Sequence, residues 1–398
     1  MGSGLWYLHG FDSMGRTYSI ISMNNIDCLF FELIQVALGT RICLSHTPSA
    51  NEWGELYAMA KKQSLVGVCF VGIQRLGADA DGGFSRIGID KMLYLTWMGM
   101  AAKIQQRNEV VNRQCVELQA KLSADGIRSC IFKGQGVASL YKLKGESLEL
   151  IDLSALRQSG DIDLYVDCER ERTLEYLQGL GMNNLEWDYV HTHAHFFEDT
   201  EVEVHYRAGA VRNLRKNRRL QRFWKENEEE FFGGEAQLGS GRIVCPTKRM
   251  HLFYLIHHTY RHLISGGIGL RQMMDVYFAL QNRDRNDDEW LKENVKAFGM
   301  TEFAEAMTWV MREVFGMGMI GMPWIPNDRE GRFLLNEIMI GGNFGKEDKR
   351  FGEGRSKLAM LTQIAKRNWH LASHYGNDAL AAPFYYIWHF CWKRIHKG

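Results

Sequence analysis

The sequence is poor in proline and contains no long apolar run. Its 398 residues include 5 prolines, and 24% of the side chains are charged while 45% are hydrophobic. This composition argues against long disordered tracts and suffices for two or three compact domains with their own cores. Because no apolar stretch approaches the roughly 20 residues that a membrane helix needs, we expect no transmembrane segment.

A C-x-x-C pair and the residue pattern of a signal peptide are also missing from the sequence. The eight cysteines stand singly between Cys28 and Cys391, without a C-x-x-C pair. A chain of this size folds without disulfides, and single cysteines are typical of a reducing compartment, so we expect a cytoplasmic protein. The N-terminus has no basic start followed by an apolar core, as a signal peptide would. Residues 1–24 are expected to form a poorly defined arm.

The chain has no excess of one charge sign. Its 48 basic and 47 acidic side chains give a formal net charge of +1. This balance gives no strong signal for a nucleic-acid partner. The densest basic run, residues 212–222, is interpreted as a solvated helix face.

Hydrophobic periodicity divides the rest of the chain into three regions. Over 25–125 the apolar residues recur at three- and four-residue intervals, which predicts an N-terminal helical region ending at the helix-stop pair Asp125-Gly126. Short β-like runs then alternate with an amphipathic helix over 126–232, where a hairpin is expected to turn at Asp199-Thr200. The pattern over 245–398 is helical again. The predicted fold class is therefore α+β.

Two aspartates stand out in the second predicted strand, "GDIDLYVD". Asp161 and Asp163 are two residues apart and so project from the same face of a strand. The alternating Ile162, Leu164 and Val166 indicate that the other face is buried. Two carboxylates this close repel each other unless a cation or a shared proton lies between them. A hard divalent cation such as Mg²⁺ (or Mn²⁺) is the natural partner for such a pair.

A third acid follows on a later strand, in "EVEVHYR". Glu203 shares one face of this strand with Glu201 and His205. Three carboxylates on neighbouring strands are the ingredients of a two-metal phosphoryl or nucleotidyl transfer site. Upstream, Gly134 and Gly136 would let backbone amides approach phosphates at the start of a short helix.

The order of these motifs resembles the nucleotidyltransferase superfamily with the DNA polymerase β-like fold. Within that superfamily the chain is similar to the bacterial "uncharacterised nucleotidyltransferase" family. The family's motifs correspond here to Lys133-Gly134, Arg157 through Leu164, Val202 through His205, and Arg271 to Asp275. The "GGNFG" at 341–345 looks like a feature of some members, of a Bacteroidetes type. The glycine turn departs from the superfamily's usual Gly-Gly or Gly-Ser, because Gln135 separates the two glycines.

The resemblance implies a small mixed sheet with flanking helices at 126–232, between the helical regions 25–125 and 245–398. It also implies an enzyme that moves a nucleoside monophosphate from a nucleoside triphosphate to a hydroxyl-type acceptor, a small molecule or a protein. The catalytic metal ligands would be Asp161, Asp163 and Glu203. The nucleotide and phosphate ligands would be Lys133, Gly134, Gly136, Arg157 and Arg271.

The histidines leave other interpretations open. His193 and His195 alternate as on a strand and, with His205, are candidates for an accessory role near the acids. His258 and His262 have the i,i+4 spacing of zinc ligands, which would suit a zinc hydrolase, although no H-E-x-x-H motif accompanies them. A non-catalytic nucleotide-binding or partner-binding module is a further alternative, and the complete set of three acids argues against it.

Two helical features of the C-terminal region have alternative roles. Arg271 and Asp275 are i,i+4 neighbours, so they would either brace their helix or place Arg271 on a phosphate with Asp275 orienting it. The last segment, "APFYYIWHFCWKRIHKG", is aromatic with a basic tail. It is interpreted as a helix packed on the core, with a position on a membrane surface as the alternative.

Overall fold

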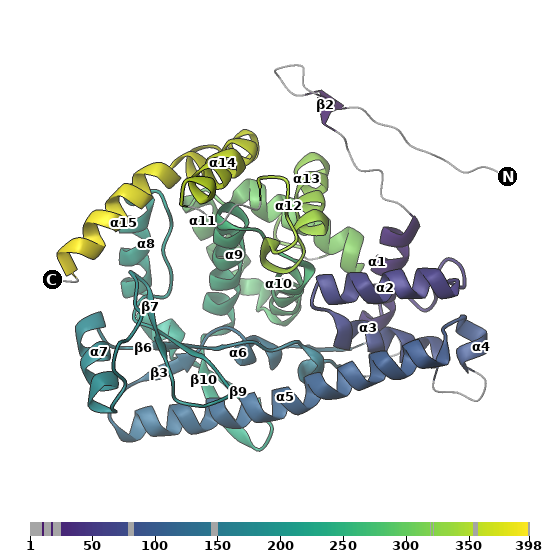
Figure 1. The fold of residues 1–398 in the computed structure, drawn as a ribbon, viewed down its shortest axis with the longest axis horizontal. Helices are drawn as coiled ribbons and strands as arrows, with labels where there is room; N and C mark the ends of the chain where they lie inside the picture. Colours follow the sequence, from purple (N-terminus) through teal and green to yellow (C-terminus); the bar gives the residue numbers. More distant parts are fainter. Residues whose placement is uncertain are drawn as a thin grey trace.

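The computed structural model describes residues 25–78, 83–144, 150–318, 320, 322–352 and 357–396, together with two short strands, Gly10–Phe11 (β1) and Thr17–Tyr18 (β2). The expected arm over 1–24 otherwise lies outside the described residues. Helical regions precede and follow a small β-sheet in the sequence. In the folded chain, helices pack around this sheet (Figure 1).

The N-terminal region is helical, as its periodicity predicts. Its elements are α1 (Asn25–Leu38), α2 (Ala50–Lys62), α3 (Val66–Ile73), a π-helical turn (Gln74–Ala78), α4 (Gly83–Ile87) and α5 (Lys91–Ala124). Helix α5 begins where the Asp90 carboxylate accepts a hydrogen bond from the Leu93 amide, 3.0 Å away. It ends at the predicted stop, where Gly126 has a φ of +75° that favours glycine. This 34-residue helix runs beneath the sheet (Figure 1).

The central sheet is mixed and has the strand order β3–β6–β8–β7. Its strands are β3 (Ser129–Ile131), β6 (Ile162–Val166), β7 (His191–Ala194) and β8 (Val202–His205). Strands β6 and β8 are parallel, whereas β3 pairs with β6 and β7 pairs with β8 in antiparallel fashion. Between β3 and β6 lie α6 (Gln135–Ala138), the hairpin β4 (Lys142–Lys144) and β5 (Leu150–Asp152), and a 3-10 turn (Ser154–Leu156).

The β7–β8 hairpin differs from the predicted two-residue turn at Asp199-Thr200. Strand β7 ends at Ala194, so residues 195–201 form a connecting loop instead. The loop is anchored on α5, because the Gln114 amide donates to Asp199 at 2.7 Å and the Thr200 hydroxyl donates to Gln114 at 2.5 Å. Arg107 also pairs with Asp199 at 2.9 Å. These contacts to a distant helix outweigh the local preference for a tight turn.

Strand β6 is buried on both faces, which is more than its alternating pattern predicts. Ile162, Leu164 and Val166 pack in the cluster formed with α5. On the opposite face, Tyr165 lies against the rings of Phe231 and Phe232, with ring centroids 5.0 and 5.7 Å away. The acidic face of the strand is therefore covered along its length and opens only at its N-terminal end.

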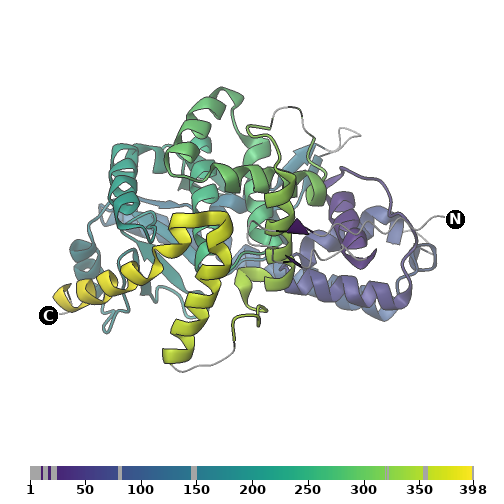
Figure 2. The same cartoon turned by 90° about the horizontal axis from the view of Figure 1, so that it is seen from above.

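The remaining elements complete the two sides of the sheet. After β6 come α7 (Arg170–Gly179), α8 (Leu214–Glu226), a 3-10 turn (Glu228–Phe231) and the antiparallel hairpin β9 (Gly234–Leu238) and β10 (Gly241–Cys245). The C-terminal helices are α9 (Lys248–Ser265), α10 (Leu270–Asn282), α11 (Asp288–Ala297), α12 (Thr301–Phe315), α13 (Asp328–Gly341), α14 (Lys357–Leu380) and α15 (Ala382–His396), with 3-10 turns at Arg285–Asp287 and Asn343–Gly345. Figure 2 shows α14 and α15 meeting at an angle on one side of the molecule.

Candidate active site

Three carboxylates meet at one edge of the central sheet. The parallel register of β6 and β8 places Asp163 directly opposite Glu203. Asp161 precedes Asp163 by two residues and so projects from the same face. One oxygen from each of the three groups lies within 4.8 Å of the others. The structure thus brings together the three acids that the sequence nominates as metal ligands.

The negative charge of this cluster is only partly balanced. Repulsion from Asp163, followed by burial and by the charge of Glu203, raises the pKa of Asp161 to about 6. Burial also acts to raise the pKa of Asp163, but the Lys133 ammonium group and a hydrogen bond with His205 outweigh burial and lower it. Asp163 is therefore compensated by Lys133, whereas Asp161 lines the cavity and has no ion pair with a cationic side chain of the described residues.

His205 joins two of the three acids. Its Nε2 lies 3.2 Å from Asp163 Oδ1 and 3.2 Å from Glu203 Oε2, and its ring is buried. His191 lies beside it with its ring centroid 4.8 Å away, so that His191, Glu203 and His205 form a second group able to hold a cation. Burial and the neighbouring His205 lower the pKa of His191 to about 4.

The other two predicted accessory histidines lie farther out. His193 binds Glu201 at 2.6 Å, and His195 is exposed in the loop after β7. His191 was not nominated, although the strand register pairs it with His205. The alternating sequence "HTHAH" at 191–195 indicates that three histidines share one face of a strand. It does not indicate which of the three lies nearest the acids.

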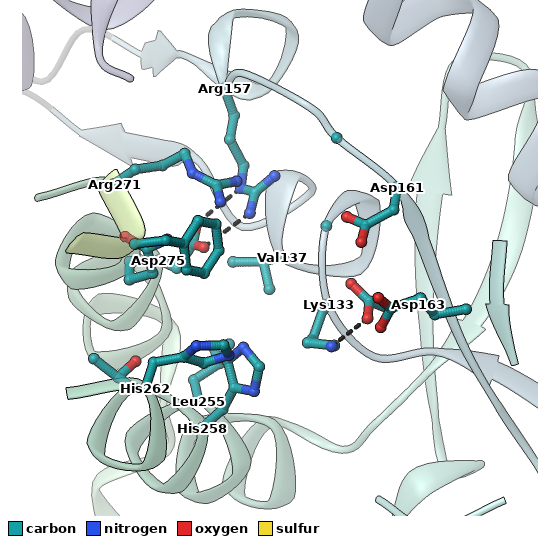
Figure 3. Close-up of a pocket in the computed structure, with 16 residues that line it drawn as sticks. Lys133, Val137, Arg157, Asp161, Asp163, Leu255, His258, His262, Arg271 and Asp275 are labelled. Atoms are coloured by element: carbon teal, nitrogen blue, oxygen red, sulfur yellow. Dashed lines mark hydrogen bonds and ion pairs between the residues drawn. The ribbon is translucent and has the colours of Figure 1, made fainter. Parts of the chain in front are cut away.

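The acids form one wall of a cavity of about 230 Å³ (Figure 3). The opposite wall comes from α9 and α10, which contribute Leu255, His258, His262, Arg271 and Asp275. Lys133, Gly134 and Arg157 also line the cavity, so four of the five predicted phosphate ligands reach it. Gly136 does not. A Cβ at Gly136 would come within 2.2 Å of the Ile131 carbonyl oxygen, so this glycine permits close packing against β3.

Two arginine side chains lie next to each other above the acids (Figure 3). Arg157 donates from Nε and Nη2 to the Asp275 carboxylate at 2.7 and 2.8 Å, and Tyr141 donates to the same carboxylate at 2.6 Å. Arg271 and Asp275 have the i,i+4 spacing that permits an ion pair, but the carboxylate of Asp275 pairs with Arg157 and not with Arg271. Asp275 binds Arg157, which lies 118 residues away in the sequence. This pair is favoured because two parallel hydrogen bonds join the buried guanidinium group to the carboxylate.

Arg271 is consequently left with little compensation. Its Nη1 donates to the Gln158 carbonyl oxygen at 3.3 Å, and burial followed by the charge of Arg157 lowers its pKa. Arg271 Nε and Arg157 Nη1 are buried and have no hydrogen-bond partner within the described part of the chain. Two adjacent guanidinium groups with unsatisfied donors favour an anion between them.

The loop at 341–345 places an aromatic ring at the same cavity. Phe344 has φ +57° and ψ 24°, a left-handed conformation that is rare for a bulky residue. Its ring centroid lies 5.3 Å from the Arg271 guanidinium carbon and 5.2 Å from the His262 ring. Gly345 allows this approach, since a Cβ there would come within 2.0 Å of the Gly266 carbonyl oxygen. Strain of this kind is typical of functional sites.

Among the described residues, His258 and His262 do not belong to a group of side chains that could hold zinc. His258 and His262 line the cavity with ring centroids 4.3 Å apart. Burial is the main cause that lowers the pKa of His262 to about 3. The two groups of metal-ligating side chains that occur among the described residues include neither of them. These histidines therefore have no third ligand within that part of the structure.

Comparison with known proteins identifies the family. The model of the family described as "Uncharacterised nucleotidyltransferase" matches residues 49–316, about two-thirds of the chain. The chain belongs to this nucleotidyltransferase family. Its α+β fold, with a small mixed sheet flanked by helices, agrees with such a core.

Membership of this family supports nucleotidyl transfer in general, with a nucleoside triphosphate as substrate. No curated protein and no solved structure matches the chain. The matched segment ends at Gly316, so the loop that carries Phe344 and the last three helices lie beyond it. None of the helices in the described part combines the length and apolarity that crossing a bilayer requires.

Proposed function

We propose that the chain transfers a nucleoside monophosphate from a nucleoside triphosphate to a hydroxyl group, at a Mg²⁺ or Mn²⁺ site formed by Asp161, Asp163 and Glu203. The observation that carries the proposal is the register of the parallel strands β6 and β8, which sets Asp163 opposite Glu203 in the wall of a cavity. Hard divalent cations bind carboxylate oxygens together with substrate phosphates. The raised pKa of Asp161 fits this donor set, because a cation there would relieve the repulsion between the acids.

The reaction forms a bond between the acceptor oxygen and the α-phosphorus and breaks the bond between the α-phosphorus and the bridging oxygen. Pyrophosphate leaves with the electron pair of the broken bond, and the proton of the acceptor hydroxyl passes to solvent. When bound, the divalent ions would supply charge stabilisation to the triphosphate and ease ionisation of the acceptor hydroxyl.

Three cationic side chains of the cavity, Lys133, Arg157 and Arg271, would balance the negative charge of the triphosphate. Arg271 Nε and Arg157 Nη1 have no hydrogen-bond partner among the described residues, and we assign them to the phosphate chain of the nucleotide. Asp275 holds Arg157 in place and is a positioning residue. Lys133, already paired with Asp163, holds that carboxylate ionised and adds positive charge beside the phosphates. Gly134 leaves room for the substrate at the turn after β3.

Phe344 is the candidate for nucleobase binding. Its ring lines the cavity, with its centroid 5.3 Å from the Arg271 guanidinium carbon. Stacking on an aromatic ring tolerates any base, so this contact would bind nucleotides without selecting one.

The free thiols of all eight cysteines agree with a reducing cytoplasm as the place of action.

The test is pyrophosphate release from a panel of nucleoside triphosphates, with Mg²⁺ or Mn²⁺ and a set of hydroxyl acceptors that includes the protein itself. We expect release to depend on the metal and to be abolished in Asp161→Asn and Glu203→Gln. Asp167→Asn is the matched control, because Asp167 lies just beyond the other end of β6 and pairs with Arg128 at 3.5 Å. Nucleotide binding without release for every acceptor would replace transfer by the alternative of a non-catalytic nucleotide-binding module.

A further inference from the structure

Helix α15 is docked on the rest of the chain by one of its faces. The rings of Trp388 and Trp392 lie edge-on to Tyr189, with centroids 5.0 and 5.4 Å away. The Arg170 guanidinium lies 5.0 Å from the Trp392 ring. The prediction that this aromatic segment packs as a helix on the core is therefore confirmed for this face.

The adjoining face of α15 is apolar and exposed. Phe384, Ile387, Phe390 and Ile395 have 70%, 66%, 59% and 76% of their surface accessible. Phe384, Ile387 and Phe390 follow one another at intervals of three residues and so lie on one side of the helix over two turns. Ile395 comes five residues after Phe390 and lies about 140° further round the helix. We call Phe384, Ile387 and Phe390 the outer face of α15. A continuous stripe of this kind on a monomer marks an interaction site, whereas scattered exposed hydrophobic residues do not.

Positive charge accompanies the outer face. Arg394 is exposed on the same side of the helix, and its guanidinium carbon lies 4.5 Å from the Phe390 ring. The sequence of α14 and α15 holds five lysines and arginines but a single acid, Asp378, although the whole chain has a net charge of +1. Asp378 is buried and bound to Lys216 at 2.7 Å. The surface of these helices thus offers cations without a competing exposed acid.

The neighbouring helix has the same character. Leu361 and Trp369 of α14 are 55% and 68% exposed and lie eight residues apart, on one side of the helix. Lys366 is exposed between them. Helices α14 and α15 adjoin at one side of the molecule, as Figures 1 and 2 show. Both lie outside the segment that the family model matches.

We propose that the outer face of α15 docks on the surface of an anionic lipid bilayer, with α15 lying in the plane of the interface. The apolar side chains would enter the boundary between headgroups and acyl chains, and Arg394 with Lys393 would meet the lipid phosphates. Apolar stripes rich in aromatic residues and flanked by Lys and Arg are the features of interfacial helices. The Arg394 side chain, lying along an aromatic ring, keeps its charge at the level of the headgroups.

A second copy of the chain fits this surface less well. A two-fold contact through the outer face would bring the same cations together. No exposed acid in either helix is available to pair with them. Negative charge must therefore come from the partner, and an anionic bilayer provides it together with an apolar layer.

The test is co-sedimentation of the full chain with vesicles of phosphatidylcholine mixed with phosphatidylserine, and with vesicles of phosphatidylcholine alone. We expect binding to the mixed vesicles that weakens with added salt and in the absence of phosphatidylserine. Arg394→Gln should weaken binding about fivefold, the factor equivalent to one cation near an anionic surface. The double variant Phe384→Ser with Ile387→Ser should weaken it by about tenfold or more, through lost apolar burial.

Ile325→Ser is the matched control, because Ile325 is 83% exposed but lies between α12 and α13. Its binding should equal that of the unchanged chain, and circular dichroism should be the same for all variants. Equal binding of the double variant and the control would overturn the proposal. So would a dimer, detected by light scattering, that the double variant abolishes while vesicle binding is absent. Pyrophosphate release by the free protein is a separate readout, so this proposal and the proposed transfer fail independently.

Discussion

Replacing Asp161 by asparagine should stabilise the metal-free protein while abolishing its activity. The carboxylate of Asp161 is held beside Asp163 and Glu203, and this repulsion is the largest cause that raises its pKa from 3.8 to about 6. A shift of this size corresponds to about 3 kcal/mol at neutral pH, at about 1.36 kcal/mol per pH unit. Because Asp161 is partly open to solvent, screening reduces the expected gain to about 1–1.5 kcal/mol.

The pH dependence of this gain has a definite sign. The folded protein binds the Asp161 proton more tightly than the unfolded chain does, so the charge of Asp161 lowers stability as the pH rises from about 4 to about 6. The advantage of Asp161→Asn should therefore be absent near pH 4 and complete above about pH 6. Its measurement is urea unfolding in the presence of a chelator, at pH 4.5 and at pH 7.5.

Two comparisons make this prediction specific. Asp167→Asn, at the far end of β6, should lose a little stability, because it breaks an ion pair with Arg128. Asp163→Asn should also be destabilising, because it leaves the Lys133 ammonium group buried without its partner. An Asp161→Asn variant that is less stable than the unchanged chain at pH 7.5, or a gain that is the same at both pH values, would refute the reasoning.

Three further predictions concern the rest of the cavity and the core. Asp275→Asn leaves the Arg157 charge buried without a counterion and should cost about 3–5 kcal/mol in urea unfolding; a loss below about 1 kcal/mol would contradict the structural role of this pair. Phe344→Ala should raise KM for the nucleotide by about 5- to 150-fold with little change in kcat, as expected for a lost stacking contact of about 1–3 kcal/mol; an unchanged KM would remove Phe344 from the nucleotide site. Burial lowers the pKa of His251 to about 4, so stability should fall as the pH drops from about 6.5 to about 4, and His251→Phe should make this acid limb of the unfolding profile shallower; an identical limb would show that His251 does not contribute.

The acidic cluster could be predicted from the sequence because it depends on local periodicity. The two-residue repeat of a strand fixes the common face of Asp161 and Asp163, and it fixes the face of Glu203 in the same way. The expectation that these strands are neighbours came from the order of the motifs, whereas their parallel register is known from the structure. The long helix α5 was equally predictable, because its stop at Gly126 is a property of the chain itself.

The cationic wall could not be predicted in the same way. Arg271 and Asp275 have the spacing of a helical ion pair, yet Asp275 is buried against Arg157 and Tyr141, which come from elsewhere in the chain. A bidentate buried pair depends on the tertiary packing of α10, and local spacing carries no information about it. His191 and Phe344 were missed for the same reason, since each becomes a neighbour of the site only through the strand register or through a loop folded onto α9.

The central claim is nucleotidyl transfer at the three acids, and transfer of a label from the α-phosphate tests it most directly. The full chain would be incubated with Mg²⁺, an acceptor mixture and nucleoside triphosphate labelled either at the α- or at the γ-phosphate. We predict that an acceptor, or the protein itself, gains label from the α-phosphate only, and that Asp161→Asn and Glu203→Gln gain none while Asp167→Asn gains as much as the unchanged chain. Label gained from the γ-phosphate, or label gained equally by Asp161→Asn, would contradict the account.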